Sequence, residues 1–588
     1  MSIPYPRRTR PRPSRWRPAL LGAFALAGVV ALNGISGPGF DPDSMLYVGA
    51  AESLARAGTL QVPFAEWPDA DSTSAVATFP PGLALAASLP IRLGVAPARA
   101  AVGVGAAAAF VTVAILAWLV EGLAGPAAAL LAALLVMLTP ALIEAHLSIL
   151  SEPLFLACLM LTLAAMIGWP DRPARYGILA GLASIVRYVG VALPGTAMLW
   201  AFLQPAGWRV RLRRAAVAGL PALVLQAAWL IRCRLAAVAV PISPVGLDTD
   251  LHFTLVEARE ALGSWLAPGL SETSWESPVA AAVGLAVAIL IIRQVQRLPW
   301  YRWPTDARMR FLAVVGIFTL CYSAVLTYAR LFVGHEIPFD GRLLSPLFVL
   351  GEAVFAIVLA ARWPGWNRIV RVGSGLALAA WFAGAVVFLE AETRDVRENG
   401  WDYNSFAWRQ SPLIHWIRTE GARYRLYTNH PVPVFFQAGR PSWQVPTSTR
   451  SDTVAAFGKV LAARHGALIG FTDTTWSPSA RPDSLARLLG LREVARFDDG
   501  TVWLPADSAA APTTTLKPPG GPALLEQAPR MSRRNAPPQA ASSRNLAPCC
   551  SRSWRSARSR SWRMRSRVTP SISPISSRVF GGSPSSPK

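Results

Sequence analysis

Apolar runs of about 20 residues recur along most of this 588-residue chain. The first covers residues 19–35 and the last covers residues 373–389. A helix of this length crosses the hydrocarbon core of a bilayer, which is about 30 Å thick. The pattern therefore predicts a mostly α-helical, polytopic transmembrane bundle over residues 19–389, with about 11 spans.

One apolar segment, residues 176–203, is long for one span and short for two. Arg172 and Arg175 precede it, and further arginines follow it from Arg209 onward. Because basic flanks favour the inner side of a membrane, the segment is expected to turn back near Arg187 and to form two short or broken helices. Non-helical backbone at this depth is tolerated only against protein or a wet cavity, so the turn should line one.

Composition supports the membrane assignment, since 52% of the residues are hydrophobic, the mean hydropathy is +0.35 and only 15% are charged. Soluble domains carry about 25% charged residues. The net charge of +23 would fit a nucleic-acid-binding protein, but its distribution does not. Residues 508–588 hold 14 Lys and Arg against the single acid Glu526, and most other cations lie in short loops. We therefore expect membrane lipid, and no nucleic acid, among the partners.

Charge also predicts the orientation of the chain. Residues 1–18 form a Pro/Arg-rich segment that is expected to be disordered and cytoplasmic. In a multi-pass protein of the inner (cytoplasmic) membrane, nearly every acid between Asp41 and Asp340 then falls on an outer loop. The first apolar run lacks a small-residue cleavage site, which favours an uncleaved anchor. The five cysteines form no metal-binding spacing and no disulfide framework.

The pattern changes after the last apolar run. Residues 424–428, 467–472 and 492–497 have the pattern of short strands, and residues 452–464 and 482–489 that of helices, so residues 390–505 are expected to form a small α/β domain outside the membrane. This domain has no Gly-rich phosphate loop and no Cys/His ligand set. Residues 506–588 are a Pro/Ser/Arg-rich tail, predicted to be disordered, whose Ser/Arg/Trp alternation a shifted reading frame would also produce.

The outer loop over residues 36–100 begins with Gly37-Pro-Gly-Phe-Asp41-Pro-Asp43-Ser-Met-Leu-Tyr47. It carries two carboxylates directly after the first span. A helix is expected over residues 44–57, with Asp43 as its N-cap and Gly58 as its end, and a second over residues 83–93. Asp43 has two interpretations that the pattern alone leaves open: a helix cap, or an acid that performs chemistry at the membrane surface.

Four motifs follow one another in a set order, and each lies on the predicted outer side or in the predicted turn. They are Asp43-Ser-x-x-Tyr47 with Phe79-Pro-Pro-Gly82 after it, Ser151-Glu152-Pro153, Gly181-Leu-Ala-Ser-Ile-Val-Arg187-Tyr188, and Asp340-Gly-Arg342. Over about residues 19–390 this order resembles the GT-C polytopic glycosyltransferases, the group that includes the protein mannosyltransferases (glycosyltransferase family 39) and the aminoarabinose lipid A transferase.

The resemblance implies that an Asp at the start of the outer loop acts on the acceptor. Many members have a second acid beside it, where this chain has Ser44. The match therefore rests on Asp43 and Tyr47, with Asp41 as the substitute acid. The implied activity is transfer of a sugar from a polyprenyl-phosphate-linked donor to a lipid, glycan or protein acceptor on the outer face.

The residue chemistry fits such a transfer. A carboxylate in a partly desolvated cleft can take the proton of an attacking hydroxyl or amine, which gives Asp43 and Asp41 the role of base. The departing phosphate needs positive charge, for which the candidates are Arg187, Arg232 and Arg342. The competing interpretation of these arginines is ordinary snorkelling at span ends, and it is least apt for Arg187, which interrupts an apolar segment.

A second outer turn carries further polar candidates. Glu144, His146 and Glu152 are expected to orient the acceptor or line the cavity, or to hold a divalent cation; an ordinary polar turn is the simpler alternative. No cofactor is required by the pattern. His335 and Glu336 form a weaker candidate pair.

Two other functions compete with the transferase. A polytopic transporter or lipid flippase would also place arginine in the membrane, but the charges cluster at outer loops and the two halves show no repeat of span pattern. A non-catalytic envelope assembly protein would use the outer domain to bind a partner. The transferase requires that Asp41, Asp43, Glu152, Arg187 and Arg342 share one outward-facing site.

Overall fold

The computed structural model describes residue 14 and residues 16–506, apart from residues 70, 72, 237–250, 272, 298–304, 334–336, 338 and 474–478. The predicted tail after residue 506, most of the predicted N-terminal segment, and His335 and Glu336 lie outside this part of the chain.

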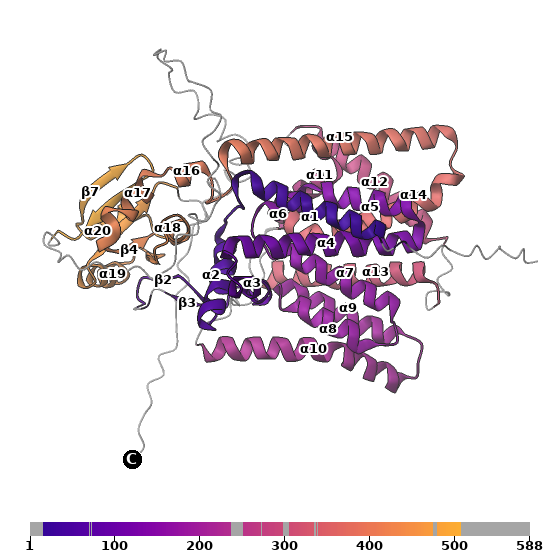
Figure 1. Ribbon diagram of the computed structural model, residues 1–588, viewed down its shortest axis with the longest axis horizontal. Coiled ribbons are helices and arrows are strands. Elements are labelled where there is room, and N and C mark those ends of the chain that lie inside the picture. Colours follow the sequence, from indigo (N-terminus) through magenta and orange to yellow (C-terminus); the bar gives the residue numbers. More distant parts are fainter. Residues whose placement is uncertain are drawn as a thin grey trace, which may run out of the picture. The chain divides into compact units, whose positions relative to one another are not determined.

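Long apolar helices run side by side in the bundle (Figure 1). By length and composition, seven helices could cross a membrane: α1 (Trp16–Ser36), α4 (Pro97–Ala124), α10 (Trp208–Leu235), α12 (Glu276–Val295), α13 (Ala307–Tyr328), α14 (Gly341–Arg362) and α15 (Arg368–Asn399). The bent pair α5 (Pro126–Leu138) and α6 (Pro140–Leu147) makes an eighth. The polytopic helical fold is confirmed, and the count of about 11 spans stays a prediction.

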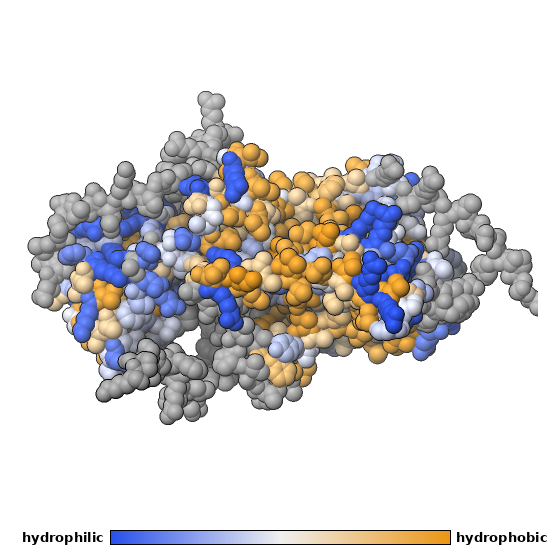
Figure 2. Space-filling model, turned by 90° about the horizontal axis from the view of Figure 1, so that it is seen from below, coloured by the Kyte–Doolittle hydropathy of each residue, from blue (hydrophilic) through white to orange (hydrophobic). Residues whose placement is uncertain are grey.

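The surface of the bundle agrees with a membrane location. Figure 2 shows hydrophobic residues covering the middle of the bundle, with hydrophilic residues toward both ends. Several side chains of this surface are large and apolar, such as Phe24 of α1 at 70%, Leu223 of α10 at 67% and Leu376 of α15 at 65% exposed. A soluble protein would rarely expose such a continuous apolar surface.

The remaining helices of the bundle are shorter. They are α7 (Glu152–Gly168), α8 (Pro173–Ser184), α9 (Ala192–Leu203), α11 (Leu251–Leu266), the 3-10 helices η1 (Tyr188–Val191) and η4 (Trp363–Gly365), and the π-helical turn η3 (Ala329–Val333). The gap between α8 and η1 confirms the break predicted near Arg187. The backbone freed there finds partners: Gly82 N–H donates to the Ile185 carbonyl at 2.8 Å, and the Gln226 amide donates to the Ser184 carbonyl at 2.7 Å.

The outer loop folds over this break. It contains α2 (Pro42–Ala57), the short strands β1 (Gln61–Val62), β2 (Phe64–Glu66) and β3 (Ser74–Ala75), and α3 (Gly82–Arg92). The prediction of Asp43 as the N-cap of the first helix was wrong, because Asp41 is the cap. Pro42 at the first helical position sets the start two residues earlier, since its fixed φ suits that position. Gly58 ends the helix in the left-handed conformation, as predicted.

The C-terminal part forms an α/β unit around a six-stranded sheet in the order β2-β5-β4-β6-β8-β7. Its strands are β4 (Arg425–Thr428), β5 (Ser442–Gln444), β6 (Gly466–Phe471), β7 (Arg492–Phe497) and β8 (Gly500–Leu504); its helices are α16 (Phe406–Arg409), α17 (Pro412–Arg418), η5 (Glu420–Arg423), α18 (Pro431–Ala438), α19 (Ser451–Ala463) and α20 (Pro482–Leu488). The three predicted strands and two predicted helices are confirmed. β5 and β8 were not predicted from the sequence.

The sheet includes a strand from far earlier in the chain. β2, which belongs to the outer loop, pairs in parallel with β5, with Ala65 opposite Trp443. Phe40 stacks on Phe436 of α18, their ring centroids 3.9 Å apart. The Ser148 hydroxyl donates to Asp402 Oδ2 at 2.8 Å. The outer loop and the α/β unit are therefore one packed assembly next to the first turn of α2.

Candidate active site

The start of α2 presents two acids of the outer loop, Asp41 at the N-cap and Asp43 in the first turn. The backbone N–H and the hydroxyl of Ser44 both donate to Asp41 Oδ1, each at 2.7 Å, so this carboxylate closes the helix start. Asp43 stands in the first turn, and Tyr47 follows one turn later on the buried side. The side chain of Asp43 is 31% exposed and that of Asp41 is 12% exposed.

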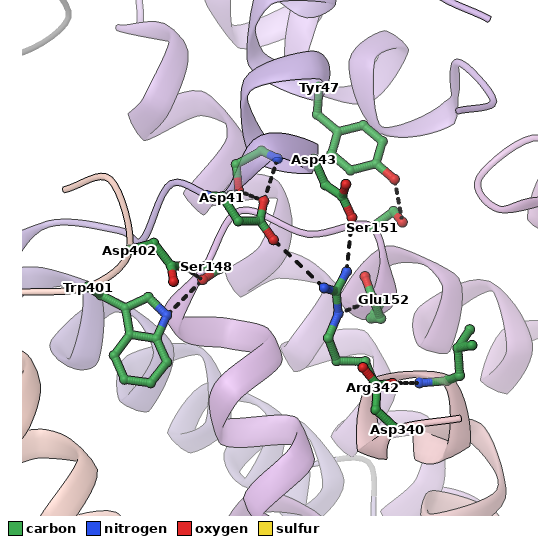
Figure 3. A network of polar contacts seen from close by, with 12 residues as sticks. Asp41, Asp43, Tyr47, Ser148, Ser151, Glu152, Asp340, Arg342, Trp401 and Asp402 are labelled. Atoms are coloured by element: carbon green, nitrogen blue, oxygen red, sulfur yellow. Dashed lines mark hydrogen bonds and ion pairs between the residues drawn. The ribbon is translucent and has the colours of Figure 1, made fainter. Parts of the chain in front are cut away.

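Arg342 joins these acids to a third carboxylate (Figure 3). It stands in the first turn of α14, whose N-cap is Asp340. Its three guanidinium nitrogens meet three different acids, at 3.7 Å from Asp41, 3.2 Å from Asp43 and 2.9 Å from Glu152. One arginine therefore links the starts of α2, α7 and α14.

Glu152 lies at the bottom of this cluster, with 2% of its side chain exposed. Its second oxygen meets Arg187, from the break between α8 and η1, at 2.5 Å. A buried carboxylate is costly unless it is paired, and Glu152 is paired on both oxygens. Glu152 therefore holds the two arginines near each other. Without a shared carboxylate, their positive charges would repel.

A chain of hydroxyl groups completes the floor. The Tyr47 hydroxyl donates to Ser151 Oγ at 3.0 Å, and Arg187 Nη1 donates to the same oxygen at 3.3 Å. Tyr47 also packs against Phe79, the aromatic residue of the Phe-Pro-Pro-Gly motif, with ring centroids 5.1 Å apart. The four predicted motifs thus meet at one place, and Tyr47 connects two of them.

Burial raises the pKa of both acids on α2. The pKa of Asp41 rises from 3.8 to about 7, first because of burial and then because Asp43 is close, while Arg342 opposes the shift. Burial also raises the pKa of Asp43, again against Arg342. A carboxylate with a raised pKa is a stronger base than an exposed one.

The geometry separates the two acids by role. One oxygen of Asp41 accepts both hydrogen bonds from Ser44, so the orientation of this carboxylate is fixed by the start of the helix. Asp43 is bound by Arg342 through Oδ2, and it is the more exposed of the two. Asp43 is therefore better placed to meet an incoming molecule, and Asp41 to fix the helix and the local charge.

Two further predicted site residues, Arg232 and His146, have backbone carbonyls as their hydrogen-bond partners, although the charge of Glu152 also acts on His146. The Arg232 guanidinium donates to the carbonyls of Val76 and Leu60 and lies over the Trp229 ring, so it ties α10 to the outer loop and does not reach the acids. Glu144 and His146 stand on α6, and the His146 Nδ1 is 2.6 Å from the Leu142 carbonyl oxygen. Among the described residues, no three His, Cys, Asp or Glu side chains gather in a metal-binding arrangement, so the predicted cation ligands do not converge here.

Two residues beside the cluster, Asp402 and Trp401, were not predicted from the sequence. Asp402 accepts a hydrogen bond from Ser148, and its negative charge contributes to the raised pKa of Asp41. The Trp401 indole donates to the same Ser148 hydroxyl at 2.9 Å. Asp402 adopts φ of 51°, a conformation that Asp tolerates better than most residues. No motif marked this pair, since it lies more than 250 residues from Ser148 in sequence.

A separate hollow of about 450 Å³ lies on the α/β unit. Arg409, His415, Trp416 and Arg418 are among its lining residues, and none of the predicted site residues is. This hollow is therefore separate from the ion-pair cluster, which is recognised by its side chains.

Comparisons with known proteins bear on the fold. No protein-family model and no curated protein matches the sequence. Two crystal structures of ArnT from Cupriavidus metallidurans do match the structure, each at 14% identity over 84% of this chain and 98% of theirs. The TM-score is 0.54 for the apo state and 0.51 for ArnT bound to undecaprenyl phosphate.

A third structure, the oligosaccharyltransferase AglB from Archaeoglobus fulgidus, gives a TM-score of 0.48 at 12% identity and covers 78% of this chain and 69% of AglB. At these identities the ArnT matches establish architecture, and they do so over nearly the whole length of ArnT. The chain therefore has the GT-C fold, as the order of its motifs predicted.

Proposed function

We propose that this protein is an integral membrane glycosyltransferase that moves a sugar from a polyprenyl-phosphate-linked donor to an acceptor at the outer membrane face. The observation that carries the proposal is the convergence of Asp41, Asp43 and Glu152 on Arg342, with Arg187 beside them. Such a site offers a base for the acceptor and cations for a phosphate within one small volume.

Asp43 is the proposed general base. As the acceptor oxygen or nitrogen attacks the anomeric carbon, its proton passes to the Asp43 carboxylate. The new bond to the anomeric carbon forms on the face opposite the departing phosphate oxygen, which leaves with the bonding electron pair. A single displacement of this kind inverts the anomeric configuration.

Arg342 and Arg187 are the proposed phosphate ligands. Both are now bound to carboxylates, so a donor phosphate would compete with Asp43 for Arg342. Release from that ion pair leaves Asp43 without its nearest cation, which raises its affinity for a proton. Donor binding would in this way strengthen the base, while buried Glu152 keeps both arginines in place.

The lipid part of the donor is proposed from the fold. ArnT from Cupriavidus metallidurans, which shares this architecture, was crystallised with undecaprenyl phosphate. Residues 390–505 would lie on the outer side of the inner membrane, because their sheet takes up β2 from the loop that carries Asp43. Arg232 is left out of the proposed phosphate ligands, since backbone carbonyls occupy it.

The transporter and assembly-protein alternatives explain less of this geometry. The acids and arginines gather at the starts of helices rather than along a path through the bundle. A scaffold would have no need to bury Glu152 between two arginines, given the cost of desolvating three charges.

The proposal is tested with membranes or proteoliposomes that contain the full chain and polyprenyl-phosphate sugars carrying a labelled sugar. We expect label to move to an acceptor fraction with wild type and to stay on the donor with Asp43→Asn, a loss of about 100- to 10,000-fold in rate. Glu52→Gln, on the same helix but paired with Arg56, is the matched control and should remain active. Undiminished transfer by Asp43→Asn would remove Asp43 as the base.

A further inference from the structure

A second buried carboxylate lies inside the membrane bundle, in a place that the proposed chemistry does not use. Glu352 is 4% exposed and stands 11 positions after Gly341, the first residue of α14. At 1.5 Å per residue this is about 16 Å along the helix, near the middle of a bilayer core about 30 Å thick. An ionised carboxylate at this depth is costly, so its retention calls for an explanation.

The neighbours of Glu352 are neutral. Trp265 Nε1 of α11 donates to Glu352 Oε1 at 2.8 Å, and the Thr139 hydroxyl lies within hydrogen-bond distance of the same oxygen. In the part of the chain that the structure describes, no arginine, lysine or histidine forms an ion pair with Glu352. This differs from Glu152, which has a guanidinium at each oxygen.

The Thr139 hydroxyl faces two oxygens, the Leu135 carbonyl and Glu352 Oε1. A threonine hydroxyl has one hydrogen to donate. The Thr139 oxygen is 3.0 Å from the Leu135 carbonyl oxygen, which can only accept. If Thr139 donates there, its contact with Glu352 is a good hydrogen bond only when the carboxyl group carries a proton and donates it to Thr139. A neutral Glu352 with its proton on Oε1 satisfies both contacts of that oxygen, whereas a carboxylate would leave two acceptors sharing the one hydroxyl hydrogen of Thr139. Oε2 is buried and has no hydrogen-bond partner among the described residues, a position that is less costly for a neutral acid than for a carboxylate.

The location of this bond connects it to the ion-pair cluster. Thr139 is the hinge residue between α5 and α6, which meet at an angle of 56°. α6 leads directly into the turn that carries Ser148 and Ser151 and then into Glu152. On the other side, Glu352 shares α14 with Arg342. The bond between Thr139 and Glu352 thus joins the two elements whose ends bring Glu152 and Arg342 to 2.9 Å.

A second contact supports the same coupling. α6 and α14 approach closely at their starts, because a Cβ built on Gly341 would be 2.9 Å from the Ala141 Cβ. Gly341 precedes Arg342 directly. A shift of α6 relative to α14 would therefore displace Arg342. A displacement of about 1 Å at a reacting site can lower the rate on the order of 100-fold.

We propose that Glu352 is a positioning residue: as a neutral carboxylic acid it donates a hydrogen bond to Thr139 and so holds the α5–α6 hinge against α14 in the register that the Arg342–Glu152 pair requires. The effect on rate rests on the proposed transferase function. The protonation state and the structural role of Glu352 do not.

Two substitutions separate shape from charge. Glu352→Gln keeps the volume without any charge, but Trp265 and Thr139 meet the same oxygen, and an amide nitrogen only donates whereas an amide oxygen only accepts. The amide therefore keeps one of the two contacts, and the proposal expects a Tm and a transfer rate between those of wild type and Glu352→Leu. Glu352→Leu keeps the volume but removes the hydrogen bonds, so it should lower the Tm and reduce transfer on the order of 100-fold. Thr139→Val should act in the same direction as Glu352→Leu.

The matched control is Thr162→Val. Thr162 is also fully buried in the bundle and donates to the carbonyl four residues earlier, Cys158, at 2.7 Å, as Thr139 does to Leu135. It has no carboxyl partner among its hydrogen bonds in the described residues. We expect Thr162→Val to change the Tm less than Thr139→Val, because only one local bond is lost.

The deciding measurement is the infrared difference spectrum of wild type minus Glu352→Gln in detergent at neutral pH, together with the Tm of each variant. A carboxylic-acid C=O band that is present in wild type and lost in Glu352→Gln, with a Tm of that variant above the Tm of Glu352→Leu, supports the proposal. A carboxylate band in its place, or a Tm of Glu352→Gln as low as that of Glu352→Leu, overturns it. Neither readout needs sugar transfer, so failure of the proposed function would leave this result standing.

Discussion

Arg342 is the residue on which the ion-pair cluster most depends, because among the described residues it is the one cation that contacts Asp41, Asp43 and Glu152 together. Its replacement by Gln removes the ion-pair partner of Asp41 and Asp43 and leaves Glu152 with Arg187. Unpairing buried charge costs about 3 to 5 kcal/mol, and the 29% exposure of Arg342 reduces this to roughly 2 to 4 kcal/mol.

We therefore expect Arg342→Gln to lower the Tm of the purified protein and to abolish donor use. Arg362→Gln is the matched control, since Arg362 is at the far end of the same helix and donates only to the Arg293 carbonyl among the described residues. Equal Tm values for the two variants would show that the cluster does not stabilise the fold.

The raised pKa of Asp41 predicts a pH dependence with a definite sign. Between its unfolded pKa near 3.8 and its folded pKa of about 7, the folded protein binds a proton that the unfolded chain does not. The stability linked to this proton is fully present below pH 3.8 and is lost as the pH rises through about 7. Asp41→Asn keeps a capping side chain but cannot ionise, so its Tm minus that of wild type should be more positive at pH 8 than at pH 5.

Thermal unfolding of the two proteins in detergent at both pH values checks this expectation. Asn is nearly as good an N-cap as Asp, so a loss of the cap should not obscure the trend. A difference in Tm that falls with rising pH would mean that Arg342 outweighs burial at Asp41.

At the residue scale, much of the site could be predicted from sequence because its members come in short motifs. Three of the motifs each lie at one helix start, where few backbone conformations are available. They are Asp43 with Tyr47, Ser151 with Glu152, and Asp340-Gly-Arg342. Asp43 was predicted as the N-cap because it directly precedes the helical pattern. The helix begins earlier, since Pro42 suits the first helical position, and this makes Asp41 the N-cap. Arg232 resembled Arg187 in sequence, and only the carbonyls around it distinguish the two.

At the element scale, the break between α8 and η1 depends on Gly190. A Cβ at this position would lie 2.5 Å from the Ala183 carbonyl oxygen and 3.2 Å from the Ser184 Cα, so backbone has to move. We expect Gly190→Ala to cost about 1 to 3 kcal/mol, as overpacking does, and to reduce transfer by shifting the neighbouring Arg187. Tm and initial transfer rate measure the two effects.

Gly195→Ala is the control for this prediction. Gly195 belongs to the adjoining helix α9, and a Cβ there meets nothing within 4 Å. This substitution should leave the rate unchanged and raise stability by up to about 1 kcal/mol through helix propensity. A loss of activity in both variants would point to a general sensitivity of the segment rather than to the close approach at Gly190.

At this scale the sequence could not reveal the shortest strands. β2 and β5 have three residues each, too few for an alternating pattern, and they pair across more than 370 residues of chain. Their place in the sheet is decided by partners such as Trp443, which packs with Tyr427 at 5.8 Å between ring centroids. β8 is buried on both faces, so its pattern does not alternate either.

At the scale of the whole molecule, the shared sheet places two parts of the chain on the same side of the membrane. Because β2 pairs with β5, the α/β unit must lie on the same side as the loop that holds Asp43. Ala456, exposed on α19, and Gly365, exposed after α14, should then be on opposite sides of the membrane. The basic residues near Gly365, such as Arg362 and Arg368, favour the inner side for that end.

We expect a cysteine at position 456 to react with a membrane-impermeant maleimide in spheroplasts, and a cysteine at position 365 to react only after permeabilisation. Cys549 and Cys550 are replaced by Ser for this experiment, and the described cysteines Cys158, Cys233 and Cys321 are buried or half-buried. The reverse labelling pattern would place Asp43 in the cytoplasm and would contradict sugar transfer at the outer face. Labelling at position 456 alone before permeabilisation would put the acids, the arginines and the sheet on the side where a polyprenyl-linked sugar would be used.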